Sequence, residues 1–396
     1  MLEVRFYLLT SKMFLMILHI LTTSVLLLYS CVASDHMLSV AEIEFMEHTL
    51  KRGTPQQCHY VQAGGYYRNC DGLIAEQDPT KAKYALWHAG GNWGDLWRSA
   101  QDVRIDSFQT LLLQNYTIIG MPQSFYYTET SLEQRDANNL MVKIAIGLDL
   151  LGGSQEPDYG TADGNSIKMA AEIFKDPKHL ELAHKRVILT WREKESYERA
   201  LKWYPFARNA IVPDIAFQLG PYDRINSHDE KNVDVLVFLR DDKESLVDSK
   251  RRDDFVQSVL SEAAGKPLTS MVVDWSNRLQ IFDTTDDFFT QTSIELLSLG
   301  RVVVCDRLHA AILSYLAGIP FVYIDQISGK VSKTLNVAFD GLPDCQNGKK
   351  GMWTSASTLE EALQKAVQMM NVNNLGHTTP TSGLLSGLRN FLNIKS

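Results

Sequence analysis

The chain has 396 residues, of which 45% are hydrophobic and 22% are charged, values typical of a globular protein long enough for two domains. The net charge is −8 and no block rich in Lys and Arg occurs, so the sequence argues against a nucleic-acid partner. An anionic substrate would have to be held by a few placed cations rather than by a general positive field.

The N-terminus contains a long stretch without charge. Residues 13–33 include no Asp, Glu, Lys or Arg and are long enough to span a bilayer as a helix. Arg5 and Lys12 precede this stretch and acidic residues follow it, so the positive-inside rule predicts a cytoplasmic tail at 1–12, a transmembrane signal-anchor at 13–33 and a lumenal remainder. A cleaved signal peptide is the alternative, because Cys31-Val32-Ala33 resembles a cleavage site.

Five cysteines fit an oxidising compartment without defining a disulfide scaffold. Cys58 and Cys70 flank a segment rich in Gly and Tyr and are the best candidates for a disulfide. Asn115 begins the sequon Asn-Tyr-Thr, whose glycosylation the sequence leaves open.

Strand and helix patterns alternate from residue 81 onward, after a stem and irregular extension predicted at 34–80. In a first domain, at 81–225, the patterns predict strands at 84–89, 116–121, 186–191 and 210–212, and helices at 96–113 and 194–203. Gly90–Asp95 is predicted to be a turn between the first strand and the first helix.

A polar segment at 220–232 predicts a linker, after which the alternation restarts in a second domain at 230–345. There the patterns predict strands at 233–239, 270–275, 301–305 and 321–324, and helices at 255–263, 284–300 and 308–317. Helices within 346–396 are expected to pack back on the first domain. The order predicts an α/β fold with two doubly wound parallel-sheet, Rossmann-like domains.

Open α/β sheets bind ligands beyond the carboxyl ends of their strands. Three arginines and a histidine follow predicted strands, and we expect the two domains to present them across one cleft. A single arginine in such a place usually caps a helix or is solvated, but four such groups favour an anion site. The polar and Gly-rich positions at these ends are Gly90–Asp95, Gln123, Ser124, Arg192, Asp214, Arg240, Asp274 and Arg307–His309.

The segment from Asp306 to Ala310 is the most informative of these ends. It joins a buried strand to the first turn of a helix, where backbone N–H groups and the helix dipole favour anions. Arg307 supplies a guanidinium fork for carboxylate or phosphate, and the dipole favours a neutral imidazole at His309. A simple helix cap made by Asp306 and Arg307 is the alternative.

Several common motifs are missing from the sequence. It contains no Walker A motif, no H-E-x-x-H and no Asp-x-Asp, and His179 and His184 are poorly spaced to share a metal. The missing Asp-x-Asp argues against a metal-dependent nucleotide-sugar transferase of the type that carries this motif. The glycines of Gly90–Asp95 let backbone N–H groups approach a ligand, although a tight turn is an equal explanation.

The order of five motifs resembles that of the polysaccharide pyruvyl transferases, over about residues 82–340. The anchor and acidic stem are similar to those of eukaryotic Golgi members, which pyruvylate galactose on glycans. The five motifs are Gly91-Asn92-x-Gly94-Asp95, Pro122-Gln123-Ser124, Arg192-Glu193-x-x-Ser196, Pro213-Asp214-x-x-Phe217, and Arg307-Leu308-His309-Ala310 followed by Gly318-Ile319-Pro320.

This resemblance implies a glycosyltransferase-B-like fold and phosphoenolpyruvate as the donor. The product would be a pyruvate ketal on two hydroxyls of a glycan sugar, such as a terminal galactose or similar hexose, with release of phosphate. The resemblance implies no metal and no cofactor. It also implies a single-pass type II protein of the Golgi membrane.

The site residues follow from the same resemblance. His309 is expected to be the catalytic base or acid, with Asp95 as partner acid or acceptor-orienting group; helix capping is the alternative for Asp95. Phosphoenolpyruvate is expected to bind Arg240, Arg307, Leu308 and His309, with Arg192 and Lys330 as helpers. The acceptor, or the loop beside it, is expected to involve Gly91, Asn92, Trp93, Gln123 and Ser124. Trp93 and Trp97 could stack on a sugar ring; for Trp97, packing in the core is equally expected.

Two other functions remain open from the sequence. A metal-independent nucleotide-sugar glycosyltransferase would share the architecture, but it needs an acidic residue near the second domain's strand ends, and Glu295 lies on the wrong side of the strand from Arg307. A catalytically silent lumenal glycan-binding protein is the third reading, against which the cluster of Arg240, Arg307 and His309 speaks.

Overall fold

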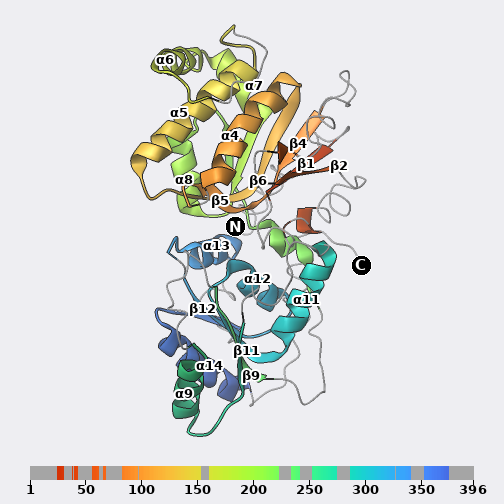
Figure 1. Ribbon diagram of the computed structural model, residues 1–396, viewed down its shortest axis with the longest axis vertical. Coiled ribbons are helices and arrows are strands. Elements are labelled where there is room, and N and C mark those ends of the chain that lie inside the picture. Colours follow the sequence, from red (N-terminus) through yellow and green to blue (C-terminus); the bar gives the residue numbers. More distant parts are fainter. Residues whose placement is uncertain are drawn as a thin grey trace, which may run out of the picture. The chain divides into compact units, whose positions relative to one another are not determined.

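The computed structural model describes residues 25–30, 38, 40–42, 56–61, 66–67, 83–96, 98–152, 160–222, 233–240, 252–273, 286–325, 327–339 and 352–373. The described chain divides into two compact units at Ile215 and Ala216, here named the N-terminal unit and the C-terminal unit. Each unit has its own β-sheet flanked by helices (Figure 1).

The N-terminal unit is built on an eight-stranded sheet with the order β3-β2-β1-β4-β6-β7-β8, and β5 also pairs with β6. All of these pairings are parallel except the one between β2 and β3. The strands are β1 (Val25–Ser30), β2 (Gln56–Val61), β3 (Tyr66–Tyr67), β4 (Lys83–Trp87), β5 (Gly90–Gly94), β6 (Tyr116–Tyr126), β7 (Val187–Trp191) and β8 (Arg208–Ile211).

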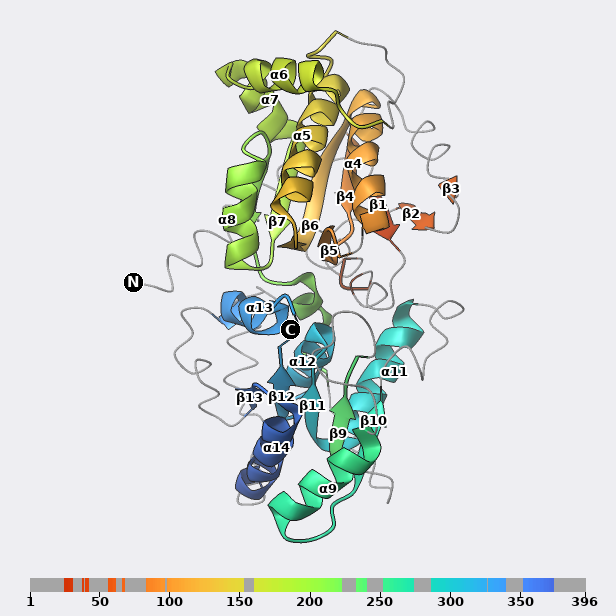
Figure 2. The ribbon, with the colours of Figure 1, turned by 60° about the vertical axis from the view of Figure 1, so that its left-hand side comes forward.

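The helices of this unit bury their apolar residues against alternate residues of the strands, among them Trp87, Ile118 and Leu189. Strands β4 and β7 are buried along their whole length, as expected for parallel strands covered on both faces. The helices, seen together in Figure 2, are α4 (Arg98–Leu113), α5 (Thr130–Gly147), α6 (Gly164–Ile173), α7 (Pro177–Arg186) and α8 (Lys194–Trp203).

The C-terminal unit has a parallel five-stranded sheet with the order β10-β9-β11-β12-β13. Helices α9 and α14 share a core cluster with Val235, Val237 and Val304, whereas α11 and α12 contact the sheet without joining that cluster. The elements are β9 (Val233–Phe238), α9 (Arg252–Ala264), β10 (Ser270–Val273), α11 (Asp286–Ser298), β11 (Gly300–Cys305), α12 (Leu308–Leu316), β12 (Phe321–Ile324), α13 (Lys330–Phe339), β13 (Trp353–Ala356) and α14 (Leu359–Asn373). A 3-10 turn, η2 (Ile215–Leu219), precedes them.

Both sheets reverse their strand order at one place. In the N-terminal unit the chain passes from β1 outward to β2 and returns to β4 on the other side of β1. In the C-terminal unit it passes from β9 to β10 and returns to β11 on the other side of β9. Such a topological switch point opens a crevice at the carboxyl ends of the two diverging strands, which is where ligands of this class of sheet bind.

The alternation of parallel strands and helices confirms the predicted α/β class, and strand β12 and helix α8 have the predicted bounds. The glycosyltransferase-B-like arrangement of the two domains stays a prediction. Gly265 has a φ of 64° just after α9, a left-handed conformation in which glycine commonly ends a helix.

The N-terminal predictions need correction. Residues 25–30, expected within a transmembrane helix, form strand β1, which pairs with β2 and β4. Strands β2 and β3 likewise lie in the segment expected to be an irregular stem. Among the described residues no helix has both the length and the hydropathy needed to cross a bilayer. Cys70, Trp97 and Asp274 lie outside the described residues.

Two further expectations were wrong. Gly90–Gly94 is a short strand, β5, rather than a turn, because its backbone continues the pairing along β6. Helix α14 packs against α9 and the C-terminal sheet, where Leu363 and Val367 belong to that sheet's core, rather than on the first domain. The sequence analysis did not predict α13 or β13.

Helix α5 approaches α4 closely at Gly147. A Cβ at that position would lie 2.7 Å from Leu112 Cβ and 3.1 Å from the Gln109 carbonyl oxygen. Gly147→Ala should therefore lower the free energy of unfolding by about 1–3 kcal/mol through overpacking. Gly164→Ala is the matched control, since nothing lies within 4 Å of its added methyl, and it should raise stability by about 0.4–1 kcal/mol. Urea unfolding of both variants measures this; equal effects would contradict the close packing.

Asp234 ties together three strands at the amino end of the C-terminal sheet. Burial alone would raise the pKa of its carboxyl, but hydrogen bonds from Thr269 and the ion pair with Arg301 bring that pKa below 3.8. The folded state thus binds fewer protons than the unfolded state, so this stabilisation is complete above pH 3.8 and is lost as the pH falls through the folded pKa. Asp234→Asn should lower stability at neutral pH, with a difference from the wild type that shrinks below about pH 4. A difference independent of pH in acid unfolding curves would refute this.

Candidate functional site

The switch point of the C-terminal sheet brings Arg240 beside the segment from Asp306 to His309. Arg240 follows β9, and its backbone N–H donates to Asp306 Oδ1 at 2.8 Å. The Asp306 N–H donates in turn to the Phe238 carbonyl at 3.3 Å. Asp306 is 1% exposed, so the carboxylate that joins the ends of β9 and β11 is shielded from water. Sequence analysis placed Asp306 in the motif but missed this positioning role.

Helix α12 starts directly beyond this junction. Arg307 is its N-cap residue, with extended backbone (φ −97°, ψ 125°) and no side-chain capping hydrogen bond. The simple cap offered as the alternative for Arg307 is therefore absent at this described helix end. Leu308 and His309 form the first turn and are buried, and Arg307 is half-buried. A guanidinium and an imidazole thus flank a helix N-terminus, an arrangement suited to an anion.

Lys330 lies at the end of the neighbouring strand. It is the first residue of α13, which follows β12, and β12 pairs with β11 in parallel. Asp325 holds the start of α13 by accepting hydrogen bonds from the N–H groups of Val331 (3.0 Å) and Ser332 (3.2 Å). Lys330 is 8% exposed. Basic residues therefore follow the carboxyl ends of three adjacent strands, β9, β11 and β12, directly in the case of Arg240 and Arg307 and at the start of the next helix in the case of Lys330.

Cys305 is the last residue of β11 and lies next to this edge. It is a fully buried free thiol. Burial raises the pKa of the Cys305 thiol well above its usual range, and the charge of Asp306 adds to the effect. A thiol held protonated in this way is a packing group and a poor nucleophile.

In the N-terminal unit, Arg192 belongs to a closed polar network. It is 1% exposed; its Nη1 donates to Asp214 Oδ2 at 2.6 Å and its Nε donates to Ser124 Oγ at 2.8 Å. Ser124 Oγ donates to Glu193 at 2.5 Å, and Ser196 Oγ donates to the same carboxylate at 2.8 Å. The charge of Arg192 is thus balanced inside the unit. This weakens its predicted role as a helper for an anionic donor, and Ser124 is a structural residue here.

Two other predicted contacts have structural roles. Trp93 is 1% exposed, donates to Tyr204 Oη at 3.0 Å and packs edge-on against Trp191, so its indole lies in the core and does not face a sugar. Asp95 Oδ2 accepts from Thr128 N at 2.7 Å and from Glu129 N at 3.2 Å, which fixes the turn leading into α5. These contacts hold the segment before α5 rather than the start of α4, so the capping and the catalytic readings of Asp95 both stay predictions.

A buried group that sequence analysis missed lies at the end of β4. Glu42, which is fully buried, accepts a hydrogen bond from Ala89 N at 2.8 Å, and its other oxygen lies 2.9 Å from His88 Nδ1. Gln123 Nε2 donates to the His88 carbonyl. Because Glu42 belongs to a segment predicted as irregular stem, no local pattern in the sequence links it to His88.

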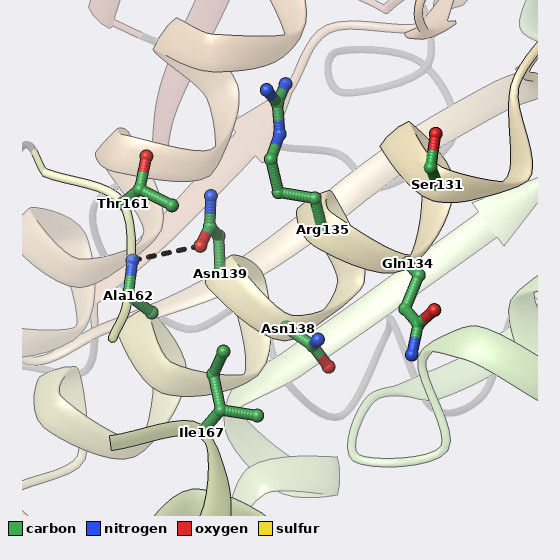
Figure 3. A pocket seen from close by; sticks show the side chains of 8 residues that line it. All are labelled: Ser131, Gln134, Arg135, Asn138, Asn139, Thr161, Ala162 and Ile167. Carbon is green, nitrogen blue, oxygen red and sulfur yellow. Dashed lines mark hydrogen bonds between the residues drawn. The ribbon is translucent and has the colours of Figure 1, made fainter. Parts of the chain in front are cut away.

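One pocket of about 300 Å³ lies away from the strand ends (Figure 3). It is lined by side chains from α5 and from the segment leading into α6, where Asn139 Oδ1 accepts from Ala162 N at 3.0 Å. None of the predicted site residues lines it. Within the described part of the chain, no three His, Cys, Asp or Glu side chains gather as metal ligands.

Comparison with known sequences finds a similarity to one family. Residues 163–328, which include Arg192, Arg240 and the segment from Asp306 to Ala310, match the sequence model of polysaccharide pyruvyl transferases. This part of the chain is therefore similar to that family.

Individual relatives show the same similarity. Pyruvyl transferase 1 of Schizosaccharomyces pombe is 26% identical over 275 residues, which are 67% of this chain and 57% of that protein. EpsO of Bacillus subtilis, named as a candidate pyruvyl transferase, is 28% identical over 275 residues, or 64% of this chain and 69% of its own. The chain thus spans less than two thirds of the first of these relatives. A crystal structure of a functionally uncharacterized protein from Klebsiella pneumoniae has 15% identity and a TM-score of 0.47, covering 88% of this chain and 99% of that one.

The Arg192 network yields a test that separates structure from donor binding. Asp214→Asn leaves a buried guanidinium without its charge partner, so the free energy of unfolding should fall by about 3–5 kcal/mol. The affinity for phosphoenolpyruvate in the folded variant should stay unchanged. Glu172→Gln, which breaks an exposed ion pair with Lys175, is the control and should barely alter stability. Loss of donor affinity in Asp214→Asn without loss of stability would place the network in the donor site.

Proposed function

We propose that the chain transfers pyruvate from phosphoenolpyruvate to two hydroxyls of a glycan sugar, forming a ketal and releasing phosphate. The family is named for pyruvyl transfer to polysaccharide. The observation that carries the donor assignment is the junction of Arg240 with the segment from Asp306 to His309 at the C-terminal switch point. The terminal galactose acceptor is the finer part of the proposal.

Phosphoenolpyruvate suits this edge because it carries two anionic groups. A carboxylate and a phosphate require separate cations, and guanidinium forks bind both with paired hydrogen bonds. Arg240, Arg307 and Lys330 follow three adjacent strands, and the helix α12 N-terminus adds backbone N–H groups beside them. Their burial strengthens each charge–charge interaction relative to water.

The proposed reaction converts phosphoenolpyruvate and two sugar hydroxyls into a ketal and phosphate. A proton is added to the methylene carbon of the enol, and the central carbon becomes electrophilic. A sugar hydroxyl attacks that carbon while a base removes its proton. The bond from carbon to the phosphate oxygen then breaks and phosphate leaves. The second hydroxyl attacks the same carbon and loses its proton, which closes the ketal with a methyl and a carboxylate as substituents.

His309 is the residue that we assign to proton transfer. Its imidazole stands in the first turn of α12, two residues after Arg307, so a donor bound by Arg307 would place its phosphate near this ring. An imidazole exchanges protons near neutral pH and can also hydrogen-bond a phosphate oxygen. Arg307 and Arg240 would stabilise the negative charge that passes to the leaving phosphate.

The remaining parts of the proposal concern cofactors, cellular location and glycosylation. No metal or cofactor takes part in the proposed reaction. A Golgi or other secretory location stays a prediction. Asn115, the predicted glycosylation site, is exposed at the turn between α4 and β6 with a φ of 65°, and its modification also stays a prediction.

The test uses the full chain with phosphoenolpyruvate and a galactose-terminated oligosaccharide. Mass spectrometry of the acceptor and phosphate release report the transfer. His309→Ala should lower kcat by about 10²–10⁴-fold, because it removes the proton-transfer group. Arg307→Met should lower kcat/KM for phosphoenolpyruvate by about 10²–10³-fold, because a charged donor to the phosphate is lost.

Arg301→Met is the matched control. Arg301 lies on β11, at the end of the strand opposite to Arg307, where it pairs with Asp234 at 3.1 Å. This variant should retain the wild-type kcat/KM for phosphoenolpyruvate. No transfer and no thermal protection by phosphoenolpyruvate in the folded wild type would overturn the proposed function.

A further inference from the structure

The N-terminal sheet has its own switch point, and its polar groups differ from those of the C-terminal sheet. It lies between β1 and β4, and the residues just beyond β4 are His88 and Ala89. Glu42, which follows β1 in the chain, contacts both of these residues. Open parallel sheets bind ligands at their switch points. The place where Glu42, His88 and Gln123 meet is therefore a candidate binding site.

Gln123 has a fixed amide orientation at this place. A backbone carbonyl can only accept hydrogen bonds, so the Gln123 group that faces the His88 carbonyl must be the NH₂. Its Oε1 consequently points away from that carbonyl. Gln123 is 1% exposed, and no described residue donates a hydrogen bond to this oxygen. A buried amide oxygen that accepts no hydrogen bond destabilises the fold, and it is uncommon unless a ligand or a water molecule donates a hydrogen bond to it.

The neighbouring polar side chains have already used their hydrogen-bonding capacity. Ser124, the next residue, donates to Glu193 and accepts from Arg192. Ser196 donates to Glu193 and accepts from Phe125 N at 2.9 Å. Within the described part of β6, the buried side-chain oxygens without a hydrogen-bond partner are Tyr116 Oη, at the start of the strand, and Gln123 Oε1, near its carboxyl end.

A β-bulge lies beside Gln123. Gly90 pairs with Gln123 and Trp93 pairs with Phe125, so Gly91 and Asn92 together stand opposite Ser124. Bulged residues interrupt the ladder of hydrogen bonds, and bulges are common next to binding sites. Gly91 is half-buried rather than buried, unlike Gly90 and Trp93. Displacement of this bulge would open a path from solvent to Gln123 Oε1.

We propose that Gln123, held by the Glu42–His88 pair, accepts a hydrogen bond from a hydroxyl of the acceptor sugar at this second switch point. This inference rests on the proposed function for the identity of the ligand. An uncharged amide oxygen needs an O–H or N–H donor and offers nothing to an anion. Arg192, the nearest cation in the network, is neutralised by Asp214, so the place suits a neutral polyol rather than phosphoenolpyruvate.

Glu42 and His88 are positioning residues in this proposal. Glu42 fixes Ala89 N and the His88 ring, and the His88 carbonyl then fixes the amide of Gln123. Truncation of Glu42 should therefore act on sugar binding through Gln123 and leave donor binding unchanged. An amide at position 42 can still accept from Ala89 N, so Glu42→Gln should restore part of what Glu42→Ala loses.

The experiment measures binding of methyl β-D-galactopyranoside to the full chain by ligand-observed NMR, and KM values for that galactoside and for phosphoenolpyruvate. Gln123→Met should weaken galactoside binding by about fivefold or more and raise its KM by a similar factor, with the phosphoenolpyruvate KM unchanged. Glu42→Ala should have the same pattern and Glu42→Gln a smaller effect. Thr190→Val is the control. It removes a buried hydrogen bond from β7 to the carbonyl of Gly120, which lies on β6 with Gln123, and it should change neither the galactoside KM nor the phosphoenolpyruvate KM.

The outcomes separate this inference from the proposed function. Galactoside binding that Gln123→Met weakens, without pyruvyl transfer by the wild type, would support the sugar site and refute the proposed reaction. Transfer by the wild type with an unchanged galactoside KM in Gln123→Met and Glu42→Ala would refute the sugar site and keep the reaction. Equal rises in both KM values, shared by Thr190→Val, would show a general structural effect and refute the assignment. Absence of both binding and transfer would refute both.

Discussion

The hydrogen bond from Arg240 N to the Asp306 carboxylate is the contact on which the candidate donor site depends. Strands β9 and β11 pair as far as Phe238 and Cys305, but the connections that follow them diverge at the switch point, so the residues beyond the paired ends need a further contact to hold them together. Asp306 provides it: its side chain binds the residue after β9 while its own backbone continues from β11. The two arginines on either side are thereby placed relative to each other by a buried carboxylate.

Both sheets reverse their strand order at one place, but the charges at these two places differ. At the C-terminal edge, basic residues follow three adjacent strands, and a helix N-terminus adds to their positive potential. At the N-terminal edge, the one strand-end guanidinium among the described residues is held by Asp214 and Ser124, and the remaining groups are neutral or paired. A common topology therefore fixes where ligands bind, while the local pairing of charges decides whether that place favours an anion or a neutral molecule.

The sequence predicted strands β9, β10, β11 and β12 best, since each is a short apolar run bounded by clear helix signals. It failed at β1 because an apolar run is consistent with a buried strand as well as with a membrane helix, and only the pairing with β2 and β4 separates the two. It failed at Gly90–Gly94 because glycine favours turns locally, whereas pairing with β6 decides the conformation here. Partners distant in sequence, such as Glu42 and His88, leave no local pattern.

Motifs shared with the family therefore mix two kinds of residue. Arg192, Glu193 and Ser196 bind one another and close the end of β7 against β6, and Trp93 fills the core, although both motifs looked like ligand contacts in sequence. Arg307 caps no helix through its side chain, and Gln123 keeps an oxygen that the described fold leaves unfilled. The distinction between them is physical: a polar side chain whose hydrogen bonds are completed inside the fold stabilises the site, whereas one with remaining capacity at a strand end can pair with a substrate.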